Sequence, residues 1–571
     1  MSAVETDLWV FRDGRKSVSS AGLLHELQRG LKKLLDSPRP RIRERCLNAL
    51  IRAGELESAL ADAGSPAVSA LASLTDALAS ALLSGDLSVV RKLSGSLNNL
   101  SLPQTIETSP PEGFSYYALH PLDFANAAMR MANPGQIISG QTIPGQAVAV
   151  IGIRSIGTTL SAVVAATLRR TGCPAERITV RPTGHPYSRM THFTSEQIQW
   201  VDEQKEQRAM FLVVDEGPGR SGSSFLSVGE ALIDADVPAE HVTLIGSHEP
   251  DLSLLCADDA VRRWKGFRFL AAVPHICARF SGHIFVGSGE WRRKFLAEDT
   301  PWPASWPQME RAKFLSPDGT RLYKFEGLGA VGEAVQQRSR RVDDAGFGCS
   351  VTDAGDGFSC YAVAEATPMT AEEVDTVVLD RMAQYCAFRA AEFGTDGVPE
   401  PLAEMLRFNI SREFEIELNL NMDALQPSRL VVVDGRMQPH EWLRTGDGIL
   451  LKTDASTHGD DHFFPGPADI AWDLAGVAVE WNLDPNALEF LLARFAQLSS
   501  NDLRRRLPIF MLAYSVFRLA WCKMAMSAVT DSSEQLRLRT ACRRYRNLAL
   551  IQMSQLGIRV PAAPREQPSL V

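Results

Sequence analysis

The largest group of neighbouring residues that could bind a ligand is a pair of carboxylates followed by a loop of small residues. It lies within Phe211-Leu-Val-Val-Asp-Glu-Gly-Pro-Gly-Arg-Ser-Gly-Ser-Ser224. Backbone N–H groups at the start of a helix bind phosphate, glycines let the backbone approach it, and serine hydroxyls add donors. Asp215 and Glu216 are placed to accept hydrogen bonds from ribose hydroxyls. The pattern predicts a site for a phosphorylated sugar, whose phosphate-binding residues are Gly217, Gly219, Arg220, Ser221, Gly222, Ser223 and Ser224.

A second loop, Gly152-Ile-Arg-Ser-Ile-Gly-Thr-Thr159, follows an earlier apolar run. Arg154 could neutralise a diphosphate, and Ser155, Gly157 and Thr158 lie where N–H groups enter the next helix. Ligands of parallel sheets bind at the carboxyl ends of the strands. We therefore expect the two loops to meet and to hold a sugar diphosphate from opposite sides.

The order of these loops resembles that of type I phosphoribosyltransferases, over roughly residues 114–255. In that family, an apolar strand, two acidic residues and a Thr/Ser/Gly loop bind phosphoribosyl diphosphate, and an earlier loop binds its pyrophosphate. The resemblance implies catalytic roles for Asp215 and Glu216, Mg²⁺ as cofactor and a flexible flap over 181–189. Glu216 replaces the family's usual second Asp, and Gly217-Pro218 replaces an apolar pair.

A lysine and a glutamate further along the chain suggest a nucleotide site. Lys324 lies on a predicted strand, and Glu333 lies on the helix that follows it. A strand lysine paired with a helix glutamate holds the α- and β-phosphates of ATP in kinase folds. Residues 359–367 look like the last strand and the hinge, with Glu365 beside the adenine. Lys324, Glu333 and Glu365 are therefore predicted to bind a nucleotide.

The stretch Gly466-Pro-Ala-Asp-Ile-Ala-Trp-Asp-Leu-Ala-Gly476 strengthens this interpretation. It resembles the Gly-Asp-Pro-x-x-Asp-Leu-Ala segment of aminoglycoside phosphotransferase-like kinases, and the likeness extends over roughly 305–555. The resemblance implies a bilobal kinase-like domain that uses ATP and Mg²⁺. Asp454 takes the place of the metal-binding aspartate.

The catalytic loop of that family overlays on Asp434-Gly-Arg-Met-Gln-Pro-His-Glu441. A gapless overlay puts Arg436 at the catalytic carboxylate and Glu441 at the magnesium-binding amide. Arginine stays protonated and cannot act as a base. Either Asp434 replaces it through a shifted turn, or the lobe binds a nucleotide without efficient transfer. We interpret the nearby His458-Gly-Asp-Asp-His462 as a polar loop beside the nucleotide rather than a dedicated metal site.

The elements that must position these residues fall into five regions. Leucines at helical spacing predict a helical N-terminal region over 1–110. Apolar strands separated by helices predict a parallel sheet, covered on both faces, in a phosphoribosyltransferase-like domain over 111–256. A connecting region (257–304), a kinase-like domain (305–560) and a flexible tail (561–571) follow. The expected fold class is a multidomain combination of α/β and α+β architecture.

Composition narrows the classes of function. The 571 residues carry a net charge of −9 without a basic stretch, which argues against nucleic-acid binding. Nine scattered cysteines without a C-x-x-C pair argue against disulfides and cysteine-based zinc sites. The apolar stretches 147–168 and 508–529 both contain basic residues, so we interpret them as buried rather than membrane-spanning. With no secretory pattern at the N-terminus, a cytoplasmic protein is expected, and a homodimer is compatible with the sequence.

Two hypotheses of different classes remain open. The first is a bifunctional small-molecule transferase, with phosphoribosyl transfer at one domain and ATP-dependent phosphorylation of a small-molecule hydroxyl at the other. The second is a ligand-sensing regulatory protein in which both domains bind their ligands without turnover. Binding assays and product assays, performed side by side, distinguish them.

Overall fold

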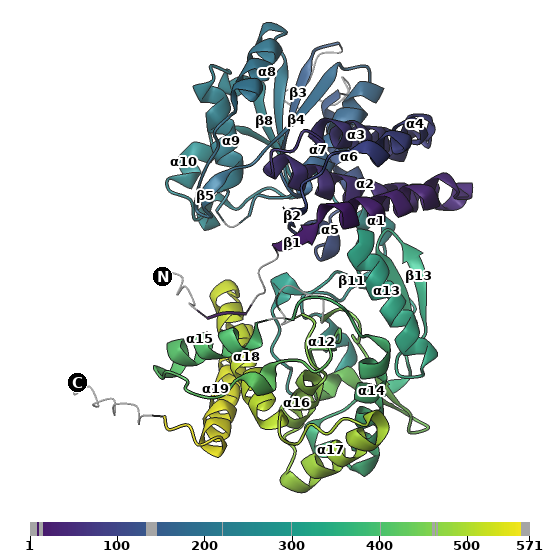
Figure 1. Cartoon of the computed structure of the whole chain (residues 1–571), viewed down its shortest axis with the longest axis vertical. Coiled ribbons are helices and arrows are strands. Elements are labelled where there is room, and N and C mark those ends of the chain that lie inside the picture. Colours follow the sequence, from purple (N-terminus) through teal and green to yellow (C-terminus); the bar gives the residue numbers. More distant parts are fainter. Residues whose placement is uncertain are drawn as a thin grey trace, which may run out of the picture.

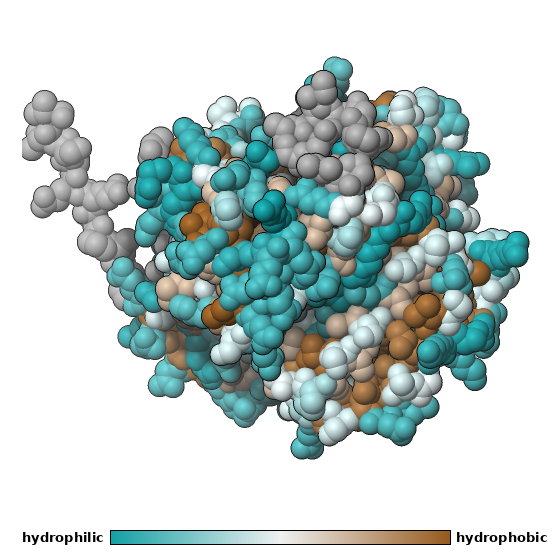
Figure 2. All heavy atoms as spheres, turned by 90° about the horizontal axis from the view of Figure 1, so that it is seen from above, coloured by the Kyte–Doolittle hydropathy of each residue, from teal (hydrophilic) through white to brown (hydrophobic). Residues whose placement is uncertain are grey.

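The computed structural model describes residues 8–10, 15–132, 145–219, 221–298, 300–399, 401–458, 463 and 466–560. Arg220, the tail 561–571 and most of the His458–His462 motif lie outside these residues. Figure 1 shows the parallel sheet and the N-terminal helices in the upper half and a helical lobe in the lower half. Seen from above, the surface is mostly hydrophilic, with hydrophobic residues in small separate patches (Figure 2).

The N-terminal helices form because leucines recur at helical spacing, as the sequence predicts. The helices are α1 (Ser20–Leu35), α2 (Arg39–Asp62), α3 (Val68–Ser84) and α4 (Ser88–Ser94), and β1 (Lys16–Ser19) pairs with β2 (Thr105–Thr108). Leu50 of α2 and Leu78 of α3 belong to the same hydrophobic core as Leu160 in the next unit. The region expected as a separate part is therefore built onto the parallel sheet.

Five parallel strands form the first sheet in the order β4-β3-β7-β8-β9. Successive residues of its apolar strands serve two different cores: Val148 and Val150 pack on the side of α7, whereas Ala149 and Ile151 pack on the side of α9. This explains why the strands are apolar throughout. The strands are β3 (Val148–Ile153), β4 (Ala175–Val180), β7 (Met210–Val214), β8 (Val242–Gly246) and β9 (Arg268–Ala271).

Helices cover both faces of this sheet, as expected. They are α6 (Pro121–Ala132), α7 (Ile156–Arg170), α8 (Ser195–Glu206), α9 (Ser223–Asp234) and α10 (Ala260–Trp264). A small hairpin, β5 (Thr183–His185) with β6 (Ser188–Met190), occupies the place of the expected flap. Because β9 pairs with β8, the sheet continues past the boundary predicted at 256.

The second sheet is antiparallel, in the order β10-β11-β12-β14-β13. It consists of β10 (Ile284–Phe285), β11 (Lys313–Leu315), β12 (Arg321–Phe325), β13 (Val351–Gly355) and β14 (Phe358–Ala362), with helix α13 (Gly329–Asp344) between β12 and β13. Gly319 and Gly357, each preceded by an aspartate in the turn between two strands, have the positive φ values that favour glycine. Lys324 lies opposite Lys313 in the β11–β12 pair.

A long segment, 286–312, joins β10 to β11 and contains α12 (Trp291–Phe295). It falls largely within the region expected to be a connector. Instead, Arg292 forms an ion pair of 2.7 Å with Glu534 of the C-terminal helix, and both side chains are buried. The backbone N–H of Ser305 also donates to Glu534, at 2.7 Å. The segment therefore ties the antiparallel sheet to the helical lobe.

A helical lobe follows a short linker. It contains β15 (Ala366–Pro368), β16 (Trp442–Thr445) and β17 (Leu450–Lys452), together with α14 (Thr376–Glu392), α15 (Leu402–Phe414), α16 (Ala471–Glu480), α17 (Pro485–Ser499), α18 (Leu507–Ala528) and α19 (Ser532–Gln555). Among the described helices, α18 alone is long and apolar enough to cross a membrane, and 78% of its most apolar window is buried inside the protein. The second apolar stretch is thus a core helix of this lobe.

The proline-containing segment 101–113 is built into the fold. It contains β2 and the start of the short helix α5 (Glu112–Ser115). The Phe114 carbonyl accepts a hydrogen bond of 2.7 Å from Leu328 N, just before α13. Arg311 donates to the Ser115 carbonyl at 2.9 Å. Helix α5 therefore connects the two halves of the molecule.

Candidate functional site

A cavity of about 260 Å³ lies between the antiparallel sheet and the helical lobe. Its walls come from β11, β12, the linker after β14, the 286–312 segment and the strand β17 with the residues that follow it. Tyr361 and Ala362, at the end of β14, line it together with Val363 and Ala364 of the linker that follows. Glu365, expected beside the adenine, is exposed and is not part of the lining. The connection between the sheet and the helical lobe lies where the sequence predicts it, but Glu365 does not contribute to the cavity.

Lys324 and Asp454 meet across this cavity. The Lys324 ammonium contacts the Asp454 carboxylate and donates to Thr457 Oγ1 at 3.1 Å. Lys313 lies 3.6 Å from the same carboxylate. Burial alone would raise the pKa of Asp454, but the two lysines and His458 outweigh it and hold that pKa well below its ordinary value. Two residues predicted for nucleotide and metal binding are thus brought together.

The expected ion pair between Lys324 and Glu333 is not formed. Glu333 is exposed on α13, and its Oε1 accepts a hydrogen bond of 2.6 Å from Asn48 of α2. The inward face of α13 carries Ser339 and other buried residues instead. Another carboxylate near Lys324 is that of Glu326, which follows β12 directly and lies 3.6 Å from the ammonium. Helical phase places Glu333 against the N-terminal region, so its assignment to the nucleotide is corrected.

Asp434, the candidate base, is buried and does not line the cavity. The Tyr385 hydroxyl donates to it at 2.6 Å. Asp473 holds its turn by accepting hydrogen bonds from the backbone N–H groups of Asp434 and Gly435, at 2.9 and 3.0 Å. Asp473 belongs to the Asp-Leu-Ala motif, so the motif positions the loop. The shifted turn therefore does not present Asp434 directly to a substrate in this conformation.

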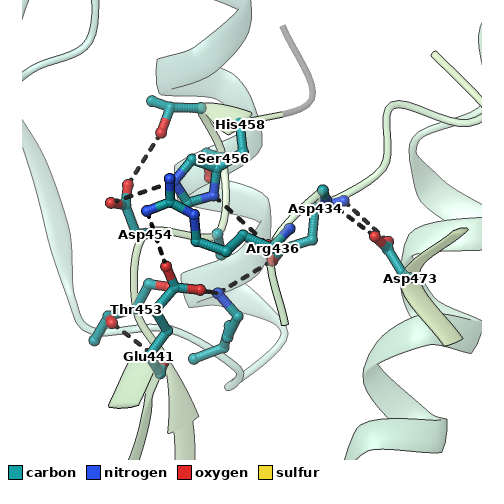
Figure 3. A network of polar contacts seen from close by, with 12 residues as sticks. Asp434, Arg436, Glu441, Thr453, Asp454, Ser456, His458 and Asp473 are labelled. Atoms are coloured by element: carbon teal, nitrogen blue, oxygen red, sulfur yellow. Dashed lines mark hydrogen bonds and ion pairs between the residues drawn. The ribbon is translucent and has the colours of Figure 1, made fainter. Parts of the chain in front are cut away.

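Lys452 fills the space between Asp434 and Glu441. Its ammonium lies 3.4 Å from Asp434 and 3.1 Å from Glu441, and its side chain is fully buried. Arg436 lies 3.6 Å from the other Glu441 oxygen. Burial favours a higher pKa for Asp434, yet Lys452, His458 and Arg389 hold it well below its ordinary value. Figure 3 shows Glu441, Asp454 and His458 on one side of Asp434 and Asp473 on the other.

Asp434, Glu441 and His458 have the chemistry of a metal site. One potential ligand atom from each lies within 4.8 Å of the others. Oxygen ligands suit Mg²⁺, but a divalent ion and an ammonium repel each other at such distances. With Lys452 in place, these residues do not fit the magnesium ion predicted at Glu441. The sequence-based assignment of Glu441 as a metal ligand is corrected for this arrangement.

The two loops predicted to hold a sugar diphosphate adjoin at the carboxyl edge of the parallel sheet. Strands β3 and β7 are neighbours, with Gly152 opposite Val214. A Cβ atom on Gly157 would lie 2.6 Å from the Val214 carbonyl oxygen, so glycine permits this contact between the loops. The strand order reverses direction between β3 and β7, which is where such sheets bind ligands. The expected meeting of the loops is confirmed.

Asp215 and Glu216 lie at this edge with few neutralising partners. Glu216 accepts a hydrogen bond of 3.2 Å from Gly113 N, and Asp215 accepts one of 2.8 Å from Glu216 N. Burial raises the pKa of Asp215 to about 7. Burial, followed by the charges of Asp215 and Glu112, raises the pKa of Glu216 to about 8. The carboxyl groups of Asp215 and Glu216 therefore favour binding a proton or a cation.

The small-residue loop is covered by the β5–β6 hairpin. The hydroxyls of Ser221 and Ser223 donate to the Pro186 carbonyl at 2.9 and 2.7 Å. Gly222 has a φ of 67° and precedes α9, and Ser224 lies in its first turn. Gly217 and Gly219 belong to the preceding turn, and the predicted phosphate role of Arg220 concerns a residue outside the described ones. Two hydroxyl groups that the sequence assigns to phosphate binding are therefore hydrogen-bonded to the hairpin instead.

Helix α2 places Asp62 beside the second loop. Its carboxylate pairs with Arg154 at 3.1 Å and with Arg181 at 2.6 Å. Ser155 N donates to Ser58 of α2 at 3.1 Å. Ser155 has a φ of 96°, a strained value for a serine. Thr158 is fully buried, which turns it away from any ligand.

A cavity of about 580 Å³ next to these residues is lined by three arginines. Burial lowers the pKa of Arg189, and the charges of Arg15 and Arg181 lower it further. Asp62, Glu55 and Glu107 are the carboxylates among the described lining residues. The described lining therefore combines three arginines with three carboxylates.

Comparison with known proteins gives similarity at the level of solved structures alone. No family model matches the chain, and no curated protein matches it. The choline kinase LicA from Streptococcus pneumoniae is 14% identical, with 42% of this chain and 89% of that chain covered and a TM-score of 0.29. A choline kinase from Cryptosporidium parvum is 11% identical, with 50% and 96% covered and a TM-score of 0.31.

An aminoglycoside phosphotransferase from Alicyclobacillus acidocaldarius is 13% identical, with 43% of this chain and 90% of that chain covered and a TM-score of 0.25. Each match covers half of this chain or less, so the remainder has no counterpart in these proteins. At these scores, a functional assignment depends on the geometry of this chain's own residues.

Proposed function

We propose that the cavity between the antiparallel sheet and the helical lobe binds ATP and that the protein phosphorylates a small-molecule hydroxyl there. One observation carries the proposal: Lys324 of β12 and Asp454 after β17 meet across the two lobes. Lys324 and Lys313 supply positive charge for the phosphates, and residues 361–364, at the end of β14 and in the linker, supply a surface for the base.

Phosphoryl transfer requires little covalent chemistry from the protein. The bond between the γ-phosphorus and its bridging oxygen breaks, and a bond forms between that phosphorus and the acceptor oxygen. The hydroxyl proton passes to a carboxylate of the centre. Glu441 lines the cavity and is therefore the candidate acceptor, whereas Asp434 is buried behind it.

Thermal-shift titration with ATP and ADP, with and without magnesium, tests nucleotide binding. Coupled measurement of ADP release in the presence of candidate hydroxyl compounds tests turnover. Lys324→Met should abolish both, whereas Glu333→Gln is the matched control, because Glu333 is exposed and bonded to α2. Absence of any nucleotide effect on the wild type would refute the proposal.

A sensing role without turnover is the alternative, and the burial of Asp434 beneath Tyr385 favours it. In that case ATP would bind and raise the melting temperature, but no acceptor would increase ADP release. Binding that depends on Lys324, combined with zero turnover across a broad panel of alcohols and sugars, would support this alternative over the kinase.

We propose phosphoribosyl transfer as a second function, at the carboxyl edge of the parallel sheet. The adjoining loops, the carboxylate pair Asp215–Glu216 and the arginine-lined cavity support it. Phosphoribosyl diphosphate with magnesium should stabilise the protein, and a suitable base or amine should release pyrophosphate. If Asp215→Asn changes neither property, or if neither occurs in the wild type, this second function fails.

A further inference from the structure

The fully buried ammonium of Lys452 lies between two carboxylates. Its ammonium contacts one oxygen of Asp434 and one of Glu441, and it donates to the Thr453 carbonyl at 2.8 Å. These carboxylates, with His458, are the group in the described chain that could together hold a metal ion. The ammonium therefore lies among ligands that would otherwise surround a divalent cation.

Among the described residues, each carboxylate of this group already faces a cation. Asp434 and Glu441 face Lys452, and Glu441 also faces Arg436. Asp473, behind Asp434, faces Arg389 at 3.6 Å. Three carboxylates thus meet three fixed cations in this group. A divalent ion placed here would add two positive charges next to a buried ammonium, which is strongly unfavourable in a low-dielectric site.

Kinase folds commonly place two magnesium ions around the phosphates, one on an aspartate and one on a catalytic-loop amide. Glu441 overlays on that amide. We propose that Lys452 is a fixed cation that replaces the second of these metal ions, so that the centre binds at most one divalent ion per nucleotide. This inference rests on the proposed ATP-dependent function, and it concerns the same cavity.

The test counts bound Mn²⁺ by electron paramagnetic resonance on the full-length protein, alone and with a non-hydrolysable ATP analogue. The wild type should bind no Mn²⁺ at Glu441 and at most one with the nucleotide. Lys452→Met should gain one site, with at least tenfold tighter Mn²⁺ binding in the absence of nucleotide. The double variant Lys452→Met/Glu441→Gln should lose that gained site, since it removes one of the three ligands.

The outcomes separate this inference from the proposed function. If the analogue binds to the wild type with two Mn²⁺ ions, and Glu441→Gln removes one of them, the inference is wrong and ATP binding stands. If the analogue does not bind at all, the proposed function fails, while a site gained in Lys452→Met still supports the role of Lys452. If Lys452→Met does not fold, the Mn²⁺ count on wild type and Glu441→Gln decides.

Discussion

The two candidate sites contain carboxylates whose pKa values are shifted in opposite directions. At the sheet edge, the pKa values of Asp215 and Glu216 are raised to about 7 and about 8. In the cavity between the lobes, the pKa values of Asp434 and Asp454 are held well below their ordinary value. Burial is the largest influence on all four and acts to raise each pKa, so burial cannot explain the difference.

Neighbouring cations explain it. Asp434 and Asp454 have buried lysines within contact distance, whereas the nearest charges to Glu216 are themselves carboxylates. The cavity between the lobes is thus balanced by its own side chains. Among the described residues, the only charge that lowers the pKa of Asp215 is that of Arg181, so this carboxylate pair favours bound protons or a ligand that brings a cation. Acidic side chains therefore lie in two different electrostatic environments in the two candidate sites.

Removing the ammonium from the balanced site should have the largest effect. Lys452→Met leaves Asp434 and Glu441 buried with less compensation, and breaking a buried pair in this way costs about 3–5 kcal/mol. We expect a marked fall in melting temperature, measured by differential scanning calorimetry. Arg293→Met, which removes an exposed pair with Glu290, is the control and should change stability by less than about 1 kcal/mol.

The sheet edge should respond to pH in the opposite sense from a salt-bridged acid. Because the folded pKa values of Asp215 and Glu216 exceed those of free carboxyls, their protonated forms stabilise the fold below about pH 4. This stabilisation is lost as the pH rises through about 7 and 8. Relative to Asp215→Asn/Glu216→Gln, the wild type should lose about 2 kcal/mol between pH 5 and 9, because partial exposure screens the charges.

Thermal melts of both proteins across that range would measure the difference. A constant offset between the wild type and the double variant would show that the two acids titrate normally. Such a result would show that the acids at the sheet edge do not have the raised pKa values that distinguish them from Asp434 and Asp454.

Asp62 should compete with anions at the sheet edge, because it pairs with Arg154 and Arg181. In Asp62→Asn, inorganic pyrophosphate should bind about tenfold more tightly, a gain of about 1.4 kcal/mol. Isothermal titration calorimetry measures this. Asp76→Asn is the matched control, since Asp76 pairs with Arg177 at 2.7 Å and does not line the arginine-rich cavity. Equal affinities in all three proteins would show that Asp62 does not compete for the site.

Glu333→Gln should have the smallest effect, because the residue is exposed and bonded to Asn48. We expect a stability change within about 0.5 kcal/mol, as for most surface substitutions. The affinity for ATP should be unchanged. A loss of ATP affinity of tenfold or more would revive the pairing with Lys324 that the sequence suggests. Titration of the variant with ATP in a thermal-shift assay is sufficient.

Local patterns made much of the fold predictable. The strand ending at Val214 and the helix beginning at Ser223 agree with the apolar run and the small-residue loop that predict them. Their meeting with the 153–158 loop follows from the parallel order of the strands. Contacts between distant segments were not predictable: the position of Asp62 beside Arg154 depends on how α2 packs against α7.

In the cavity between the lobes, too, residues with a local sequence signal were predictable and residues placed by distant contacts were not. Lys324 and Asp454 carry local signals, and the structure brings them together. Lys452 was missed, although it ends β17 only two residues before Asp454, because a lysine in a strand gives no sign of facing inward. Glu333 was misplaced because the sequence alone does not fix which face of α13 the N-terminal helices cover.

Helix α5 has a practical consequence for any attempt to divide the chain. Its Gly113 N–H donates to the Glu216 carboxylate of one half, and its Phe114 carbonyl accepts a hydrogen bond from Leu328 N of the other half. A fragment starting at 305 would lack β10 and the Phe114 carbonyl that binds Leu328 N. A fragment starting at 111 would lack the N-terminal helices and would expose the apolar face of α7. Separately expressed halves should therefore aggregate or be degraded by proteases, and each activity is best assayed in the intact polypeptide.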